Sequence, residues 1–288
     1  MHYRSNSRIM FEILNYTAFT IFTILILLPF LNAISISLSD YKFVNSGEVR
    51  FWPKGFNLTS YDLIVTNKYF LYTLGNTIFL TFVNTLLTIV LALAAGYALA
   101  SKHIVGGKVL MNFYLIPMYF SGGLIPFYLV VQGLQLRETY WSLILPVVVN
   151  VFYIIIFRNS IAAVPAELAE SAEMDGASDL VILARVIFPV ISPMVAAFVI
   201  FSAVAFWNEW FNVMLFISDM KMSTLQYWLR GVLTRTFDSF QLFGRDQRVN
   251  FRANEMAAAI VTIIPIVLVY PFLQRFFIHG IIVGAVKG

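Results

Sequence analysis

The chain has 288 residues, of which 60% are apolar and 12% charged, against about 25% charged residues in an ordinary soluble domain. Together with a mean hydropathy of +0.81, this argues against a soluble globule, because one core cannot bury so many apolar residues. The absence of cysteine excludes a disulfide framework, a thiolate metal site and a cysteine nucleophile. The net charge of +4 is far from that of a nucleic-acid-binding surface.

Six apolar segments are each long enough to cross the hydrocarbon core of a bilayer, which takes about 20 residues of helix. They lack the two-residue alternation of a membrane barrel strand, so all six are predicted to be helices. Glu209 is the one carboxylate within them. The predicted spans are residues 13–38, 74–100, 108–131, 140–157, 192–217 and 256–278, with internal prolines at 29, 117, 126, 146 and 265 that predict kinks.

The first segment follows Arg4 and Arg8, and its end contains an A-x-S sequence that resembles a signal-peptide cleavage site. Its apolar run is longer than the 7–15 residues of a signal core, and five more segments follow, so a retained first helix is predicted. The polar stretch 40–68 is expected to form an extramembrane loop. Residues 218–255 are expected to form a small folded excursion with one short helix.

The distribution of basic residues leaves the orientation open. With the N-terminus in the cytoplasm, the inner segments carry eight Lys and Arg and the outer segments carry eleven. Positive charges favour the cytoplasmic side, but the rule is weak for long loops. In the short connections the bias is opposite, because Lys102 and Lys108 lack nearby acids whereas Arg137 is next to Glu138.

The loop at residues 160–192 is the one strongly acidic connection. Pro165 suits the start of a helix, Gly176 suits its end, and Ser178 can cap a second short helix that runs to Pro189. The five acids are Glu167, Glu170, Glu173, Asp175 and Asp179.

The first of these two helices is predicted to have a small apolar face. Leu168, Ala169 and Ala172 fall on one side at three- and four-residue spacing, with acids around the rest. Such a face is predicted to insert into a groove of another protein.

The run PAELAESAEMDGASDLVILARVIFPVISP closely resembles the coupling-loop motif of the inner-membrane permease subunits of bacterial ABC importers. That motif reads E-A-A, three residues, G, nine residues, I-x-L-P. Ser171, Val186 and Phe188 replace Ala, Ile and Leu and keep size or apolar character. The matching positions are Glu170, Ser171, Ala172, Gly176, Val186, Phe188 and Pro189. The stretches FSGGLIPFYLVVQGLQL, FWNEWFN and YPFLQRFFIHGIIVGAVKG are similar to the subgroup that carries oligosaccharides, so the resemblance extends from about residue 70 to residue 288.

The resemblance implies an all-α permease domain over residues 1–288, with a core of about 70–280, six transmembrane helices and a cytoplasmic coupling loop at 160–192. It places both termini in the cytoplasm of a bacterial cell and the chain in the inner membrane. The implied partners are a second homologous permease, two ATP-binding cassette subunits and an extracytoplasmic solute-binding protein that delivers an oligosaccharide. The residues expected to couple the chain to the ATPase are Glu167, Glu170, Ser171, Ala172, Asp175, Gly176 and Pro189.

The chain has no nucleotide-binding loop of its own, because its one Gly-Lys pair, Gly107-Lys108, is followed by Val109 and lacks the first glycine. ATP and Mg²⁺ are therefore expected on the partner ATPase, and this chain is not expected to be an enzyme. A metal site is not expected either, because His2, His103 and His279 are scattered over tails and a loop.

Glu209 lies in the sequence Trp207-Asn208-Glu209-Trp210. A carboxylate in hydrocarbon costs about 2.5 kcal/mol or more, so it should face a cavity, the bundle interior or a partner. It can line a translocation path, or it can lie at the interface with the two tryptophans as anchors. Asn84, Asn150 and Tyr153 also lie within spans, where they can line the path or join helices.

Two questions stay open. The outer loops 40–68 and 218–255 hold ten basic residues against seven acids, with a cluster at Arg245, Arg248 and Arg252. This excess can attract an acidic, uronate-type saccharide or an acidic binding protein. The alternative function is an autonomous secondary transporter or channel, which would need several intramembrane carboxylates or inverted repeats. The length and identity of the saccharide and the identity of the second permease are not indicated.

Overall fold

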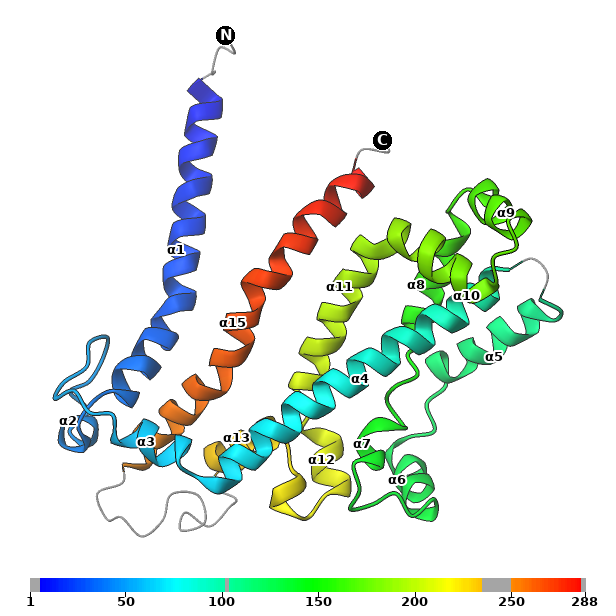
Figure 1. Ribbon diagram of the computed structural model, residues 1–288. Coiled ribbons are helices and arrows are strands. Elements are labelled where there is room, and N and C mark those ends of the chain that lie inside the picture. The colour runs from blue at the N-terminus through cyan, green and yellow to red at the C-terminus, as the bar shows by residue number, and fades with distance from the viewer. Residues whose placement is uncertain (1–5, 102–103, 235–249, 286–288) are drawn as a thin grey trace. The chain divides into compact units, whose positions relative to one another are not determined.

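The computed structural model describes residues 6–101, 104–234 and 250–285, with the burial of side chains described as far as residue 268 (Figure 1). Within these ranges the chain forms helices, and the extended backbone is limited to one bridge between Ser39 and Phe56. The all-α prediction is confirmed. The chain divides into two compact units, residues 1–70 with 229–264 and residues 71–228 with 265–288. The expectation of one domain over residues 1–288, with its core at about 70–280, stays a prediction.

Four described helices are long and apolar enough to cross a membrane, and two bent helix pairs raise the number to as many as six. The four are Ser7–Ser37, Lys68–Ala100, Asp179–Trp207 and Phe251–Leu268. One bent pair joins Gly107–Tyr119 to Leu124–Gly133 at 115°, and the other joins Val151–Ala162 to Ala166–Met174 at 78°. The predicted polytopic helical membrane protein is thus confirmed, with some of its spans broken.

The first unit is built on α1 (Asn6–Ser37) and the extramembrane segment that follows it. This segment contains α2 (Tyr41–Asn45) and α3 (Thr59–Val65), and the unit also takes in the beginning of α15 (Phe251–Ala285). Ile36, Val44 and Val49 form its small buried cluster, with Met256 packed against them. Asp40 caps α2 by accepting the backbone N–H of Lys42.

The second unit contains most of the bundle. Its elements are α4 (Lys68–Ala100, from residue 71), α5 (Gly107–Tyr119), α6 (Leu124–Gly133), α7 (Trp141–Ile144), α8 (Val151–Ala162), α9 (Ala166–Met174), α10 (Asp179–Val181), a π-helical turn (Ile182–Ile187), α11 (Phe188–Trp207), α12 (Phe211–Phe216), a 3₁₀ turn (Met220–Met222) and the start of α13 (Leu225–Thr234). One buried cluster joins α4, α8 and α11 through Ile89, Phe157 and Ile191. A second cluster joins α4 to α7 and α12 through Leu80, Leu143 and Val213.

Three predicted spans differ from the structure. The third turns through 115° at residues 120–123, where Gly123 has a φ of +85°. The fourth is interrupted at residues 145–150, around Pro146. The fifth ends at Trp207 rather than continuing to residue 217. A membrane bundle tolerates these breaks because neighbouring helices can satisfy the freed backbone groups.

The predicted short helix from Ser178 to Pro189 is also wrong, because the helix passes through Pro189 and Pro193 into α11. Pro189 is the second residue of α11 but lies inside a continuous helical segment, so its missing N–H leaves a carbonyl of the preceding turn without its usual donor. The π-helical turn just before it absorbs the change of register. The loop and the fifth span are therefore one continuous helical segment from Asp179 to Trp207.

Candidate functional site

The acidic loop folds as the short helix α9, set at 78° to the end of α8. Pro165 directly precedes the helix. Gly176 ends the α9 segment with a φ of +81°, a conformation that favours glycine. The N–H of Ala177 donates to the carbonyl of Ala172 at 3.0 Å, which completes the predicted glycine-type helix end.

The small residues of α9 face the chain's own bundle. Ala169 and Ala172, together with Ala177 just beyond the end of α9, are half-buried and pack against the cluster that contains Phe157. The prediction that this face inserts into another protein is wrong for Ala169 and Ala172, whereas Leu168, the third residue of the predicted face, is exposed. The two alanines permit the short helix to approach the bundle closely and fix α9 in place.

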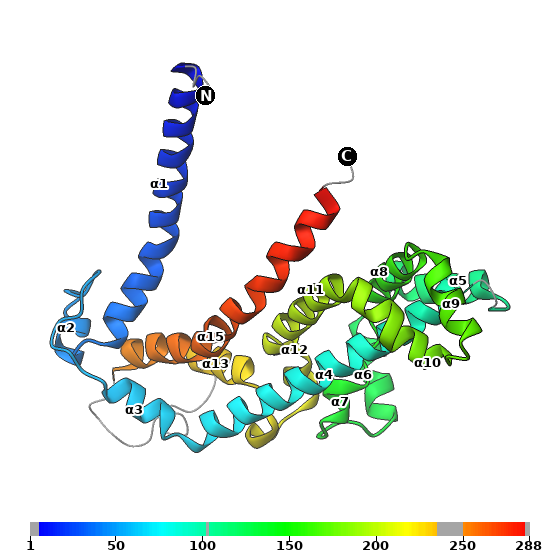
Figure 2. The same ribbon diagram turned by 45° about the horizontal axis from the view of Figure 1, so that its top comes forward.

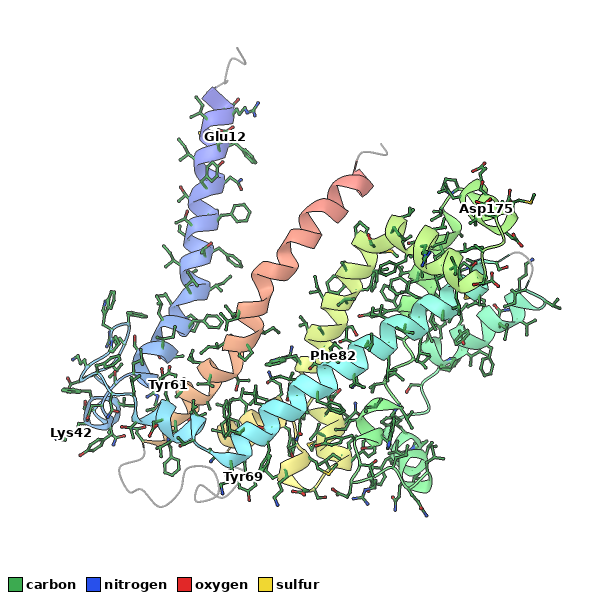
Figure 3. The ribbon with its side chains drawn as sticks, viewed as in Figure 1. Glu12, Lys42, Tyr61, Tyr69, Phe82 and Asp175 are labelled. Atoms are coloured by element: carbon green, nitrogen blue, oxygen red, sulfur yellow. The ribbon has the colours of Figure 1, made fainter. Side chains whose placement is uncertain are left out.

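The surface that α9 and α10 turn outward is a different one. Met174 is 89% exposed, Leu180 is 78% exposed, and Leu168 is also exposed. All five acids of the loop are exposed around these apolar side chains, and Figure 3 shows Asp175 at the outer side of the α9 segment. Sequence reasoning missed Met174 and Leu180. For Met174, its position away from the two half-buried alanines on the helical wheel of α9 was a usable signal, whereas Leu180 lies on α10, beyond the turn that ends α9.

The loop is also tied to α4. Figures 1 and 2 show α9 and α10 beside the C-terminal end of α4. The hydroxyl of Tyr97, on the last turns of α4, donates to Oδ1 of Asp179 at 3.1 Å. Gly96 lies against α8, where a Cβ would be 2.9 Å from the backbone nitrogen of Arg158. The acidic loop, α4 and α8 are therefore in direct contact.

Glu209 has defined partners at the break between α11 and α12. Its Oε1 accepts the backbone N–H of Asn212 at 2.9 Å, and its Oε2 accepts the Asn212 side-chain amide at 3.1 Å. The backbone carbonyl of Glu209 accepts the hydroxyl of Thr224 at 2.7 Å. The side-chain carbonyl of Asn208 accepts Nε2 of Gln226 at 3.2 Å. Glu209 directly precedes the N-cap residue of α12, and its carboxylate accepts a free N–H in the first turn of that helix, where a negative charge is favourable.

Trp207 lies on an apolar cavity of about 580 Å³ between α4, α11 and α15. The hydroxyls of Thr81 and Thr85 and Nε1 of Trp207 are buried without a hydrogen-bond partner among the described residues. The other lining residues are Ile78, Phe82, Leu86, Ile89, Val199, Ala203, Val204, Pro265 and Ile266. This lining suits hydrocarbon or another helix better than a sugar.

The remaining candidates for the path make contacts between or within helices. The side-chain amide of Asn84 donates to the carbonyl of Leu143 at 3.0 Å in a buried position. The side chain of Asn150 caps α8 by accepting the N–H of Tyr153. The Tyr153 ring lies edge-on to Phe198, with ring centroids 4.7 Å apart. None of Asn84, Asn150 and Tyr153 lines the cavity beside Trp207, so the structure does not assemble the six candidates into one site.

A polar junction at the opposite end of α4 from the acidic loop escaped sequence reasoning. The side-chain amide of Asn76 donates to the carbonyls of Lys221 and Ser223 at 2.7 and 2.9 Å. Its side-chain oxygen accepts the hydroxyl of Tyr140 at 2.8 Å. One amide thus holds three segments of the chain, and no sequence pattern singled it out.

Glu138 forms a second junction near that end. Both of its carboxylate oxygens accept the N–H of Ser218 at 3.0 Å, and its own N–H donates to the carbonyl of Phe216 at 3.0 Å. These backbone bonds lower the pKa of Glu138 below its ordinary value. Glu138 and Gln135 both have a φ of +55°.

Several residues singled out from the sequence, namely His2, Lys102, His103, Arg245 and Arg248, lie outside the described residues. Among the described residues, no group of three His, Asp or Glu side chains is arranged to hold a metal ion.

Comparisons with known proteins give one consistent family. Residues 88–283 match the model of the family described as "Binding-protein-dependent transport system inner membrane component". The chain is 36% identical over 266 residues to protein LplC of Bacillus subtilis (strain 168), covering 91% of this chain and 90% of LplC. It is 32% identical over 282 residues to the polygalacturonan/rhamnogalacturonan transport system permease protein YtcP of the same organism, covering 97% of this chain and 99% of YtcP. A chain of a bacterial ABC transporter involved in the import of the acidic polysaccharide alginate has a similar structure, with a TM-score of 0.90 and 28% identity, covering 96% of this chain and 100% of that one.

Proposed function

Because the chain belongs to the family of inner membrane components of binding-protein-dependent transport systems, we propose that it is the membrane-spanning subunit of an ATP-driven importer of acidic oligosaccharides. It is a permease of the oligosaccharide ABC importer type, a transport component and not a catalytic enzyme. Family membership sets aside the autonomous carrier or channel. The chain would work by alternating access together with a second permease and an extracytoplasmic binding protein.

The observation that carries the ATP-driven part of the proposal is the outward surface of α9 and α10. Exposed apolar side chains ringed by carboxylates suit a groove with basic residues at its rim on another protein. Two partner ATP-binding cassette subunits would bind ATP and Mg²⁺, and one of them would dock here. This docking requires the loop and both termini to lie in the cytoplasm. Glu167, Glu170, Ser171, Asp175 and Gly176 belong to this surface. Ala172 packs against the chain's own bundle, and Pro189 lies in the first turn of α11.

The test uses the purified complex in proteoliposomes. Glu170→Lys reverses a charge on the proposed contact, and Gly176→Leu removes the left-handed helix end. Both variants are expected to abolish sugar uptake while the complex still inserts and the ATPase still hydrolyses ATP. The matched control is Asp62→Lys on α3, a charge reversal in the other unit, which should retain uptake. Normal uptake in both loop variants would contradict the proposal.

An acidic substrate is the finer part of the proposal. A relative is named for polygalacturonan and rhamnogalacturonan transport, and the similar solved structure belongs to an importer of alginate. In this chain, Lys221 and Arg252 are exposed basic residues in the long predicted outer segment 218–255. Basic side chains on the outer side would raise the local concentration of uronate oligomers.

The experiment compares the initial uptake of oligogalacturonate with that of a neutral oligosaccharide. Lys221→Glu with Arg252→Glu is expected to reduce uptake of the acidic sugar more than that of the neutral one, with a larger difference at low ionic strength. An equal loss for both sugars would show that these residues dock an acidic binding protein instead. Trp207, Asn208, Glu209, Asn84, Asn150 and Tyr153 stay proposals for the path.

A further inference from the structure

The segment after α1 folds back along the helix that precedes it. The N–H of Asp40 donates to the carbonyl of Lys54 at 3.0 Å, and the N–H of Lys54 donates to Oγ of Ser39 at 2.9 Å. The N–H of Asn57 donates to the carbonyl of Leu38 at 2.9 Å. Residues 54–57 are therefore fixed at the C-terminal end of α1.

The segment after α1 also contacts α1 at a point before the C-terminal end of the helix. The side-chain amide of Asn32 donates to the carbonyl of Arg50 at 2.5 Å. Asn32 lies five residues before the end of α1, which is about 7.5 Å along the helix axis. Figures 1 and 2 show this loop rising beside the end of α1. Gly55 makes the fold-back possible, because its φ is +61° and a Cβ there would lie 3.0 Å from Cβ of Asp40.

The charged residues that flank the apolar stretch of α1 indicate how deep the contact between Asn32 and Arg50 lies in the membrane. No charged residue lies between Glu12 and Asp40, so the middle of the apolar stretch falls near residue 26. Half of the hydrocarbon thickness is about 15 Å, or about ten helical residues, so the hydrocarbon should end near residue 36. Asn32 then lies about 6 Å inside that boundary for an untilted helix. The carbonyl of Arg50 is therefore at the depth of the outermost acyl carbons.

The side chains in the segment that begins at Arg50 are largely aromatic and basic. Trp52 is 83% exposed and Phe56 is 69% exposed, and Phe51 and Arg50 are exposed as well. Tryptophan prefers the membrane interface because its ring is apolar and its N–H is polar. Arginine pairs with the phosphate groups of lipids at the same level. Lys54, unlike Arg50, forms a salt bridge with another described residue: its Nζ lies 3.0 Å from Oε2 of Glu48.

We infer that residues 50–56 form a membrane anchor, in which Trp52 and Phe51 insert beneath the lipid headgroups and Arg50 binds their phosphates. The anchor lies in the leaflet at the C-terminal end of α1, which is the outer leaflet in the proposed topology. It holds the end of α1 at a fixed depth. The inference needs only that α1 spans the membrane, so it stands or falls independently of the transported sugar and of the ATPase.

The test measures the depth of residue 52 in the complete transporter, reconstituted in vesicles of phosphatidylethanolamine and phosphatidylglycerol. The chain has no cysteine, so single nitroxide labels can be attached through Trp52→Cys, Phe22→Cys and Lys42→Cys. Phe22 is an exposed residue in the middle of α1, and Lys42 is an exposed residue of α2 in the same unit. The label at 52 should collide with oxygen more, and with a water-soluble nickel complex less, than the label at 42, with a depth parameter nearer to that at 22.

Two results would overturn the inference. Nickel collisions as frequent at 52 as at 42 would place the residue in water. Low collision rates with both reagents would show that a protein partner, such as the second permease or the binding protein, covers it. A second measurement keeps the native side chain. The fluorescence difference between wild type and Trp52→Phe should be quenched by lipids brominated near the headgroup, and quenching by aqueous iodide alone would contradict the anchor.

Discussion

The hydroxyl of Tyr97 on α4 donates a hydrogen bond to the Asp179 carboxylate across 3.1 Å, and this bond joins the longest helix of the second unit to the acidic loop. Asp179 begins α10, three residues after the glycine that ends the α9 segment. A force applied to α9 would therefore reach α4 through this bond as well as through the covalent chain.

Tyr97→Phe removes the donor and keeps the ring. We expect uptake per ATP hydrolysed to fall about fivefold, since a hydrogen bond to a charged group contributes about 1–3 kcal/mol and this site is partly exposed. Asp179→Asn should retain most of the coupling, because the amide oxygen still accepts the hydroxyl. The control is Tyr119→Phe on α5, an exposed tyrosine. An unchanged ratio in Tyr97→Phe would show that the bond transmits nothing.

A substitution at Gly96 tests the close contact between α4 and α8. A methyl group at this position would meet the backbone nitrogen of Arg158 at 2.9 Å, so Gly96→Ala should cost about 1–3 kcal/mol by overpacking. Gly75→Ala on the same helix has nothing within 4 Å and should be neutral or stabilising by about 0.5–1 kcal/mol. The apparent midpoints of thermal unfolding in detergent compare the two. Equal midpoints would refute the close contact.

Two substitutions of Glu209 can distinguish a structural role of its carboxylate from a role in the translocation path. Glu209→Gln keeps an oxygen for the N–H of Asn212, so it should leave stability nearly unchanged, whereas Glu209→Ala should cost about 0.5–2 kcal/mol through loss of the cap. Urea or thermal unfolding measures the difference. If Glu209→Gln keeps full stability but changes the relative uptake of acidic and neutral sugars, the carboxylate acts on the substrate and not only on α12.

The stability of the junction between Glu138 and Ser218 should depend on pH. The pKa of Glu138 is lowered by the backbone bonds from Ser218, so the ionised form is favoured in the folded protein. Its stabilising effect is present above the ordinary carboxyl pKa and is lost as the pH falls through the lowered value. The hydrogen-exchange protection of the Ser218 amide, corrected for intrinsic rates, should therefore decrease on acidification. Glu138→Gln keeps an oxygen that can accept the Ser218 N–H but does not titrate, so the protection in this variant should not change with pH. A pH-independent protection in wild type would contradict this.

The elements that sequence patterns predicted well are those set by local physics. The apolar runs gave α1, α4 and the beginning of α15, because a lipid-facing helix needs about 20 apolar residues and little else. The left-handed helix end at Gly176 followed from the preference of glycine for that conformation. Both features depend on a few neighbouring residues.

The features that escaped prediction depend on contacts between distant residues. The inward packing of Ala172 needs the cluster around Phe157, and the capping role of Glu209 needs the helix to break at Asn208. Asn76 joins segments that are 64 to 147 residues apart. Hydropathy cannot locate such bonds, because it reports how apolar a segment is and not which distant residue the segment contacts.

Labelling at residue 170 tests most simply whether the acidic loop meets the ATPase in the cytoplasm. Since the chain has no cysteine, Glu170→Cys introduces one site for a membrane-impermeant maleimide. A cytoplasmic loop should be labelled in inside-out vesicles, protected there when the ATPase subunits are bound, and not labelled in intact right-side-out spheroplasts. Labelling of residue 170 in the intact spheroplasts would place the loop outside the cell, where it could not meet the ATPase.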